Sequence, residues 1–315
     1  VRGQQSARRA MEIAAAGGHH ILLIGSPGCG KTLLASRLPG ILPMASDEEA
    51  IESAAIASVS GRGLDLTRFR QRPFRSPHHT SSAVALAGGG TQPKPGEISL
   101  AHNGVLFLDE LAEWDRKSLE VLRQPLESGT VSISRASNTA EFPARFQLVA
   151  AMNPCPCGWF GDNSGRCRCT ADAIERYRGK LSGPLLDRID IHLAMSRISH
   201  EELHLNAPQG ECSAVIRARV IRARDRQRQQ SGVCNAHLSQ SQLKEHCQLN
   251  DGNQHLLDQA MNALQLSARA TYRILRVART IADLADSANI ETPHLTEAIQ
   301  YRQLDRALSI PKRRV

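Results

Sequence analysis

The chain has few aromatic residues and no long apolar segment. Phe, Trp and Tyr make up 3% of its 315 residues, which argues against stacking on nucleic-acid bases as a main mode of binding. The mean hydropathy is −0.32, and no apolar run approaches the roughly 20 residues that a membrane-spanning helix needs. No signal peptide is recognisable, so we expect a cytoplasmic protein without a membrane partner. The first residue is Val1, and we expect an N-terminal part of the protein to precede it.

Acidic residues are outnumbered by basic ones. The chain has 39 Lys and Arg against 31 Asp and Glu, a formal net charge of +8. This excess is compatible with nucleic acid as a partner, held mostly through its phosphates, and also with an enzyme that is merely basic. The eight cysteines do not indicate a disulfide framework in a reducing cytosol. The length allows two domains with cores of their own.

Residues 25–32 form a complete phosphate-binding motif of the pattern G-x-x-x-x-G-K-[ST]. The apolar run 21–24 before it is typical of a buried strand, and residues 32–38 after it are typical of a helix. Glycines let the backbone approach phosphate oxygens, and the N–H groups of such a loop point at a polyphosphate. Lys31 would neutralise the β- and γ-phosphates of ATP, and Thr32 would bind Mg²⁺. The predicted nucleotide-binding residues are Gly25, Ser26, Pro27, Gly28, Cys29, Gly30, Lys31 and Thr32.

Two carboxylates follow an apolar segment further along the chain. Residues 105–108 read Val-Leu-Phe-Leu, and Asp109 and Glu110 come directly after them. In P-loop enzymes the first such carboxylate holds Mg²⁺ and a group beside it orients the attacking water. We therefore expect Asp109 to bind Mg²⁺ and Glu110 to act as the general base. A solvated strand end is the alternative, but the phosphate-binding motif favours an enzyme that hydrolyses ATP.

Alternating strand and helix patterns predict a doubly wound parallel α/β sheet in the first part of the chain. The expected strands are 21–24, 105–108, 146–151 and 189–193, and the expected helices are 4–16, 32–38, 48–59 and 115–128. From about residue 211 the patterns are helical only, over 212–230, 239–248, 252–265, 267–287 and 292–306. We therefore expect an α/β nucleotide-binding domain over 1–205 and a helical lid domain over 206–315.

Three segments of the first domain stand apart from the alternating pattern. Residues 61–104 are interrupted by Gly and Pro and predict a loop-rich insertion. Residues 130–143 predict a β-hairpin with Arg135 at or near its tip. Residues 155–169 form a cysteine-rich loop.

The two nucleotide motifs, followed by a helical region, resemble the AAA+ superfamily. The resemblance implies that Asn153 is the sensor 1 residue, which helps to position the attacking water. It also implies that Arg188, in the segment 185–190, is an arginine finger that enters the ATP site of a neighbouring subunit. Arg269, in the segment 267–269, resembles sensor 2 and would contact the γ-phosphate. A surface salt bridge is the alternative for each arginine.

Longer segments carry a closer resemblance. The insertion and the hairpin look like those of the AAA+ branch that contains magnesium chelatases and MCM helicases. Residues 72–79, 95–102 and 276–284 resemble the bacterial magnesium-chelatase-like ComM (YifB) family, whose whole members carry an additional N-terminal Lon-protease-like domain. The resemblance implies a hexameric, ATP-driven helicase for DNA branch migration and strand integration in homologous recombination during natural transformation. It also places residues 1–4 at the adenine end of the ATP pocket and makes other recombination proteins candidate partners.

In related rings the insertion and the hairpin face the central pore. This implies that Lys94 and Arg135 bind DNA phosphates, with ordinary solvated loop charges as the alternative. His78 and His79 either join them or order the insertion. Phosphate contacts carry little sequence information, so single-stranded or branched DNA would be bound with tolerance of sequence.

Two functions of another class remain open: a magnesium-chelatase-type subunit or a chaperone-like ATPase, each remodelling a protein partner without acting on DNA. A σ54-type activator fits poorly because its G-A-F-T-G-A loop is absent.

Four of the cysteines form a cluster in the sequence, namely Cys155, Cys157, Cys167 and Cys169. Four thiolates brought together by a tight loop can bind Zn²⁺ in a closed structural site, and we favour zinc. An iron–sulfur cluster or four free thiols are the alternatives. Cys29 lies inside the phosphate-binding motif, where a lowered pKa would make the nucleotide site sensitive to oxidation; this is a secondary hypothesis.

Overall fold

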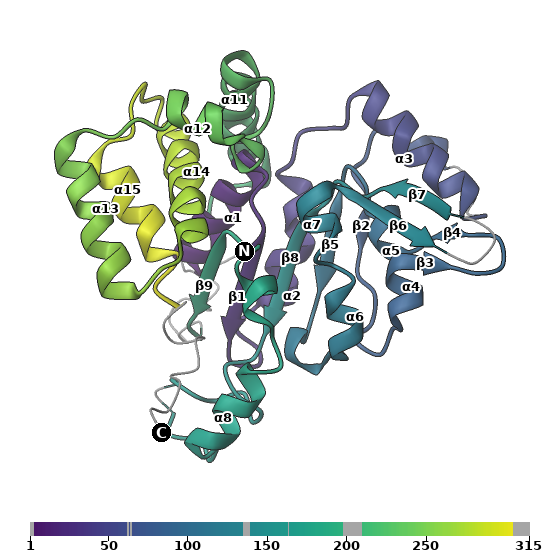
Figure 1. Cartoon of the computed structure of the whole chain (residues 1–315), viewed down its shortest axis with the longest axis horizontal. Coiled ribbons are helices and arrows are strands. Elements are labelled where there is room, and N and C mark those ends of the chain that lie inside the picture. The colour runs from purple at the N-terminus through teal and green to yellow at the C-terminus, as the bar shows by residue number, and fades with distance from the viewer. Residues whose placement is uncertain are drawn as a thin grey trace.

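The computed structural model describes residues 3–61, 63, 65–134, 139–162, 164–197 and 210–304. Its centre is a five-stranded sheet in which every pairing is parallel (Figure 1). The strands lie in the order β2 (Phe74–Arg75), β5 (Val105–Leu108), β8 (Gln147–Met152), β1 (Ile21–Gly25) and β9 (Ile191–Met195). Because the strands are parallel, their carboxyl ends all meet at one edge of the sheet, where ligands bind in open α/β sheets.

The two faces of the sheet belong to two separate cores. Along β1, Ile21 and Leu23 contribute to one core, whereas Leu22 and Ile24 contribute to the other. Successive side chains of a strand point to opposite faces, and parallel strands buried on both faces read as continuous apolar runs. This explains why unbroken apolar segments in the sequence predicted buried strands correctly.

Short and medium helices surround the sheet. Those within the first two thirds of the chain are α1 (Gln5–Gly17), α2 (Lys31–Arg37), α3 (Asp47–Val59), α4 (Ala83–Ala87), α5 (Glu97–Leu100), α6 (Arg116–Glu120), α7 (Pro125–Ser128), α8 (Ala171–Arg178) and α9 (Gly183–Leu186). Helix α3 begins at a capping box in which Ser46 and Glu49 exchange hydrogen bonds. Helix α1 ends at Gly18, whose φ of 73° is in the left-handed region that glycine favours.

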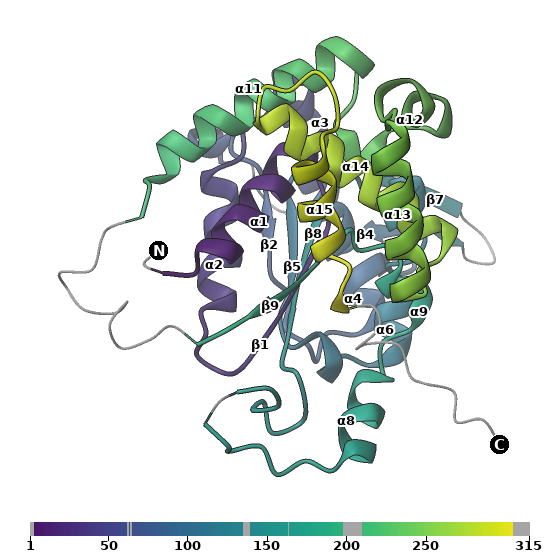
Figure 2. The ribbon, with the colours of Figure 1, turned by 90° about the vertical axis from the view of Figure 1, so that its left-hand side faces the viewer.

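Beyond residue 210 the described chain is helical, as expected. The helices are α11 (Ser213–Ser231), α12 (Gln240–His246), α13 (Asp251–Leu264), α14 (Ala268–Leu284) and α15 (Thr292–Gln300). Serine and asparagine side chains cap the first turns of α12, α13 and α14. Figure 2 shows α11 crossing above α1 and α2, with α12 to α15 grouped beside them. The arrangement confirms the predicted fold class, a P-loop AAA+ parallel sheet with an all-α lid. The expected join at 205–206 lies outside the described residues.

The segment 61–104 is less of an insertion than its sequence suggests. It contains β2, the edge strand of the central sheet, which pairs with β5. The part outside the sheet is a short antiparallel hairpin, β3 (Gly88–Gly89) and β4 (Lys94–Pro95), between α4 and α5. A strand of two residues leaves no alternating pattern to recognise, which is why the prediction missed it.

Two further predictions can be compared with the described elements. The hairpin expected at 130–143 is confirmed as β6 (Thr130–Ser134) and β7 (Thr139–Pro143), and its tip, with Arg135, lies outside the described residues. The single helix expected over 115–128 is wrong, because α6 ends at Glu120 and α7 begins at Pro125. Proline has no N–H and clashes with the preceding helical turn, so it starts a new helix here. Among the described residues no helix combines the length and apolar character that crossing a membrane requires.

A buried polar network joins the amino ends of β1 and β9 to α14. Asp190, directly before β9, accepts a hydrogen bond from the backbone N–H of His20 at 3.0 Å and another from Arg273 at 2.5 Å. Burial raises the pKa of Asp190, but the charge of Arg273 and the hydrogen bond with His19 outweigh burial and hold this pKa well below its usual range. The ring of His20 also accepts the backbone N–H of Leu148 at 3.0 Å, and burial lowers the pKa of His20 to about 4.

We expect the free energy of unfolding to fall as the pH is lowered from 6.5 towards 4. In this window His20 takes up a proton in the unfolded chain, where its pKa is the ordinary 6.5, but stays neutral in the folded one. Because the pKa of Asp190 is lowered in the folded chain, this carboxylate reduces the free energy of unfolding only below about pH 4.

The variant His20→Asn isolates this contribution, because the Asn carbonyl can accept the same backbone N–H but does not titrate. Chemical denaturation of both proteins at pH 7, 5.5 and 4.5 should show a shallower decline for the variant. Identical declines would contradict the assignment to His20, since other buried histidines titrate equally in both.

Candidate functional site

The phosphate-binding motif connects β1 to α2 at the carboxyl edge of the sheet. Gly28 and Gly30 have φ values of 79° and 96°, which glycine adopts without strain. A Cβ atom on either residue would meet nothing within 4 Å, so the space in front of both is open.

The side chain of Lys31 is folded back onto its own loop. Its Nζ donates to the carbonyl oxygens of Gly25 at 2.7 Å and Ser26 at 3.1 Å, and to Oδ1 of Asn153 at 3.1 Å. Asn153 directly follows β8, the neighbour of β1, so the parallel register brings it to the motif. The structure thus joins two residues that lie far apart in the sequence and were both predicted to act on the γ-phosphate.

Thr32 and Asp109 are also in direct contact. The Thr32 hydroxyl donates to Oδ2 of Asp109 at 2.7 Å, and the indole N–H of Trp114 donates to the backbone carbonyl of Asp109 at 2.9 Å. Hydroxyl and carboxylate oxygens are ligands that Mg²⁺ prefers. The donor set formed by these two residues therefore fits a Mg²⁺ ion that accompanies a nucleotide.

Glu110 extends from the same strand end in an unusual backbone conformation. Its φ is 51°, its N–H donates to Oδ1 of Asp109 at 2.9 Å, and its side chain is 51% exposed. His79 lies 2.9 Å away, measured from its Nδ1 to Oε2 of Glu110. The neighbouring His78 instead contacts Thr80 at 2.8 Å.

The contact between His79 and Glu110 is a part of the site that sequence reasoning missed. We expected the two histidines to bind DNA or to order the insertion. The residues that follow β2 emerge beside those that follow β5, because the two strands are parallel neighbours. If β2 had been recognised as a strand beside β5, the sequence would have predicted that His79 lies next to Glu110.

Cys29 does not have the property that the oxidation hypothesis required. Burial raises the pKa of its thiol, and this effect outweighs the opposing charge of Lys31. A raised pKa keeps the thiol protonated and unreactive at neutral pH. The hypothesis of a lowered pKa at Cys29 is therefore wrong.

Two family models match the chain in succession. The model for magnesium chelatase, subunit ChlI, matches residues 1–203, and the model for the C-terminal part of subunit ChlI matches residues 210–302. The chain belongs to the magnesium chelatase ChlI family. The match confirms the resemblance that the motifs indicated.

Individual proteins are similar over nearly the whole chain. The competence protein ComM of Haemophilus influenzae is 51% identical over 306 residues, 97% of this chain and 60% of that protein. The protein YifB of Salmonella typhimurium is 49% identical over the same shares. An MCM-type protein of Methanocaldococcus jannaschii, MJ0961, is 27% identical over 188 residues, 58% of this chain and 21% of that protein. The chain thus spans about 60% of the length of the first two relatives.

In this ChlI-family chain the two arginines predicted to act on ATP lie away from the phosphate-binding motif. Arg188 is 7% exposed, donates to the carbonyl oxygen of Pro184 at 2.6 Å and forms an ion pair with Glu127. Arg269 is exposed on the first turn of α14. A hydrogen bond from Arg188, helped by the charge of Arg269, lowers the pKa of Glu127.

These side chains lie at the amino edge of the sheet. Arg188 comes shortly before β9, and Arg273, one turn after Arg269, is bonded to Asp190 at the beginning of that strand. The phosphate-binding motif lies at the opposite edge, and the five residues of β1 separate the two edges by about 16 Å. Neither arginine meets the phosphate-binding residues of its own chain within the described part.

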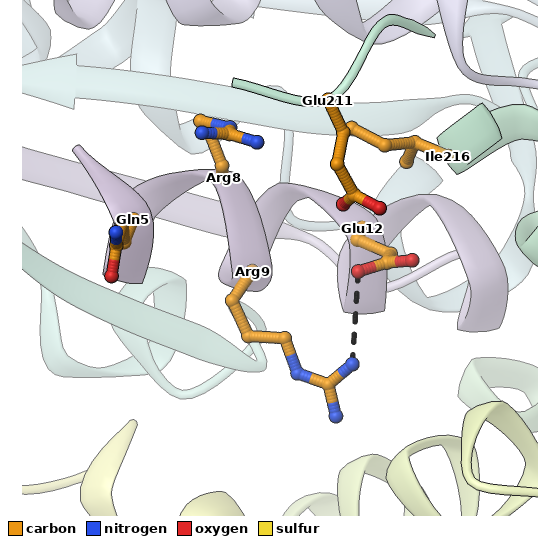
Figure 3. A pocket seen from close by; sticks show the side chains of 6 residues that line it. All are labelled: Gln5, Arg8, Arg9, Glu12, Glu211 and Ile216. Carbon is orange, nitrogen blue, oxygen red and sulfur yellow. Dashed lines mark ion pairs between the residues drawn. The ribbon is translucent and has the colours of Figure 1, made fainter. Parts of the chain in front are cut away.

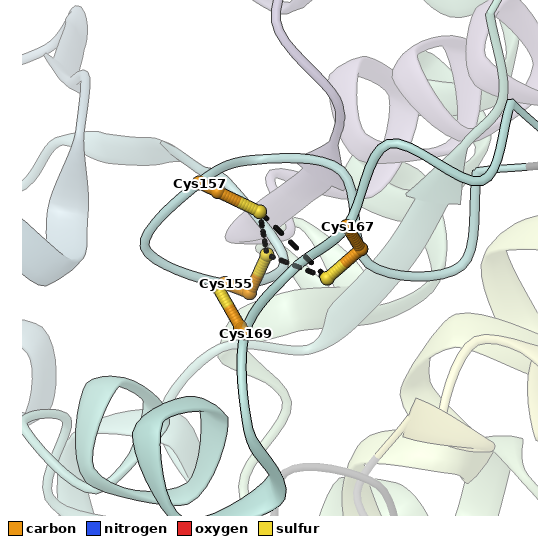
Figure 4. Close-up of side chains that lie close together, drawn as sticks. All are labelled: Cys155, Cys157, Cys167 and Cys169. Atoms are coloured by element: carbon orange, nitrogen blue, oxygen red, sulfur yellow. Dashed lines mark hydrogen bonds between the residues drawn. The ribbon is translucent and has the colours of Figure 1, made fainter.

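The four cysteines predicted as a metal site are brought together. Their four Sγ atoms all lie within 4.8 Å of one another (Figure 4). The loop that carries them follows Asn153 and leads into α8. The backbone N–H of Trp159 helps to lower the pKa of Cys157 to about 6, so one thiol of the group is readily ionised.

Of the two predicted DNA contacts the structure describes only Lys94. Its side chain belongs to β4 and is exposed, in the hairpin between α4 and α5. Arg135 lies outside the described residues, so the two cannot be compared in position.

The start of α1 lies close to the phosphate-binding motif. The side-chain amide of Gln4 donates to the carbonyl oxygens of Cys29 at 3.1 Å and Ser196 at 2.6 Å. Val1 and Arg2, also expected at the adenine end, lie outside the described residues. A shallow cavity of about 250 Å³ opens beside this first turn (Figure 3), lined by Gln5, Arg8, Arg9, Glu12, Glu211 and Ile216.

Proposed function

We propose that this chain is the ATP-hydrolysing motor of a hexameric DNA-translocating protein. The observation that carries the proposal is the meeting of Lys31, Asn153, Thr32 and Asp109 at one edge of the sheet, with Glu110 beside them. These are the groups that phosphoryl transfer to water needs: a cation for the phosphates, oxygen ligands for Mg²⁺ and a carboxylate to activate water. Similarity to the competence protein ComM supports a role in competence, and DNA branch migration in natural transformation is the process that we propose for it.

Each residue of the site has a proposed task. Lys31 exchanges its carbonyl partners for the β- and γ-phosphates, and Asn153 holds it and the attacking water in line. Glu110 accepts the proton of that water, a contribution of roughly 10²–10⁴-fold in rate. Thr32 and Asp109 would hold Mg²⁺, which would neutralise charge on the phosphates.

The position of the arginines supports hydrolysis that depends on a ring. Arg188 and Arg269 both lie toward the edge opposite the phosphate-binding motif, so in the proposed ring each acts on ATP held by a neighbouring subunit. An arginine that stabilises the transferring phosphoryl group contributes roughly 10³–10⁵-fold in rate. In the proposed ring, Glu127 releases Arg188 when a neighbouring ATP site approaches.

Lys94 is proposed to contact DNA phosphates from the β3–β4 hairpin. Its exposure on a short hairpin supports such a contact, and a single cation discriminates poorly between nucleic acid and peptide. The match to magnesium chelatase models supports the second candidate, an ATPase that remodels a protein partner.

The first test is the ATP hydrolysis rate of the chain with no DNA and with single-stranded, duplex and Holliday-junction DNA. We expect hydrolysis that DNA stimulates, with a loss of about 10²-fold or more in the variant Glu110→Gln. Lys94→Ala should lower the affinity for DNA and make its dependence on salt concentration less steep, because a phosphate contact is lost. A rate that no DNA changes would favour the protein-remodelling candidate.

A second test concerns the contact between His79 and Glu110. In His79→Ala the Glu110 carboxylate loses its partner and its orientation, so kcat should fall by about 10-fold or more while ATP affinity stays unchanged. His78→Ala is the comparison variant: it removes the ring that packs 4.2 Å from the His79 ring and bonds Thr80, but it leaves the His79–Glu110 contact in place, so kcat should fall less. Equal kcat values for the two variants would remove His79 from the site.

A third test asks in which subunit the arginines act. Lys31→Ala chains cannot bind the phosphates but supply arginines, whereas Arg269→Ala chains keep an intact phosphate-binding motif. Each variant alone should be inactive. Mixed rings should regain hydrolysis, because the arginines of the Lys31→Ala chains complete the ATP sites of the Arg269→Ala chains. Arg269 is exposed, so its removal should not impair folding. Mixtures as inactive as the separate variants, although they assemble, would contradict action between subunits.

A further inference from the structure

The four-cysteine loop has the dimensions of a site for a single metal ion. Cys155 Sγ lies 3.4 Å from Cys157 Sγ and 3.9 Å from Cys167 Sγ, and the latter two atoms are 3.7 Å apart. Four thiolates around one Zn²⁺, each with a Zn–S bond of about 2.3 Å, lie about 3.8 Å from one another. The separations therefore match a tetrahedral zinc site before any metal is added.

The same distances argue against a disulfide and against the iron–sulfur cluster that the sequence left open. A disulfide would bring two sulfur atoms to about 2.0 Å, and these cysteines are free. In an iron–sulfur cluster the cysteines bind two or four different irons. Thiolates on different irons are held further apart than the 4.8 Å that contains all four Sγ atoms here. Among metal sites the distances favour a mononuclear one, and the metal content of the chain decides between it and four free thiols.

The turn between the cysteines is packed directly against the nucleotide site. Gly158, which follows Cys157, has a φ of 83°, and its N–H donates to the carbonyl oxygen of Cys155 at 2.9 Å. A Cβ atom on Gly158 would lie 2.7 Å from Cδ of Pro27 and 3.7 Å from Cγ of Asn153. The backbone of the cysteine loop at Gly158 thus lies directly beside Pro27 of the phosphate-binding motif and close to Asn153, with no room for a side chain against Pro27.

We propose that Cys155, Cys157, Cys167 and Cys169 bind one Zn²⁺. This metal fixes the turn at Gly158, and the turn in its place keeps Pro27 of the phosphate-binding motif in position. The metal has no open ligand position and takes no part in hydrolysis. Its loss releases Pro27 and Asn153 and weakens ATP binding. The coupling to ATP rests on the proposed function, whereas the metal site does not depend on it.

The metal site is tested by elemental analysis of the chain purified under reducing conditions. We expect one zinc per chain, lost in Cys157→Ser and Cys169→Ser. Cys212→Ser is the control, because Cys212 is exposed and lies outside the cluster, and it should retain the zinc. Absence of zinc, iron in its place, or zinc retained by both cluster variants would overturn the assignment.

The coupling is tested with two glycine variants that keep all four cysteines. Gly158→Ala places a methyl group against Pro27, whereas Gly161→Ala imposes the same strain, at a φ of 78°, with nothing within 4 Å. Both should retain zinc, and affinity for a fluorescent ATP analogue should fall by about 10-fold or more only in Gly158→Ala. Equal affinities in these two variants would overturn the coupling.

Removal of zinc from the unmodified chain by a chelator should lower the same affinity, and added Zn²⁺ should restore it. An affinity that chelation leaves unchanged would also overturn the coupling. Failure of the zinc-loaded, unmodified chain to bind the analogue at all would instead refute the proposed ATPase function and leave the metal site standing.

Discussion

The parallel register of β1, β5 and β8 is the constraint on which the candidate site depends. It pairs Ile24 with Met152 and Leu108 with Ala150, so the ends of the three strands lie within about two residues of one another. The phosphate-binding motif, the Asp109–Glu110 pair and Asn153 each begin where one of these strands ends. Since a strand in a sheet buried on both faces cannot shift without moving its whole apolar set, the register holds these groups at contact distance.

The two edges of the sheet have different chemistry. The carboxyl edge carries the phosphate-binding groups, and the amino edge carries Arg188, Arg269 and the buried Asp190–Arg273 pair that anchors α14. This separation supports the proposed ring, in which a neighbouring subunit would supply the arginines to each nucleotide site.

Two segments outside the phosphate-binding motif lie against residues of the candidate site. His79 comes from the segment after the edge strand and contacts Glu110, and Gly158 comes from the cysteine loop and contacts Pro27. The first contact bears on the proposed general base and the second on the nucleotide-binding backbone. In both cases a residue from a different part of the fold lies against a group of the proposed site: His79 against Glu110, and Gly158 against Pro27.

The sequence by itself determined those features that a short run of residues can encode. It identified the phosphate-binding motif, the paired carboxylates, the four spaced cysteines, the buried strands and the helical C-terminal part, because each is a local pattern of residue type and period. Only the tertiary structure revealed the two-residue strand β2, the contact of His79 with Glu110, the packing of Gly158 on Pro27 and the location of both arginines at the far edge. These features arise from pairing and packing between segments distant in sequence, and such contacts leave no periodic signal in the residues that make them.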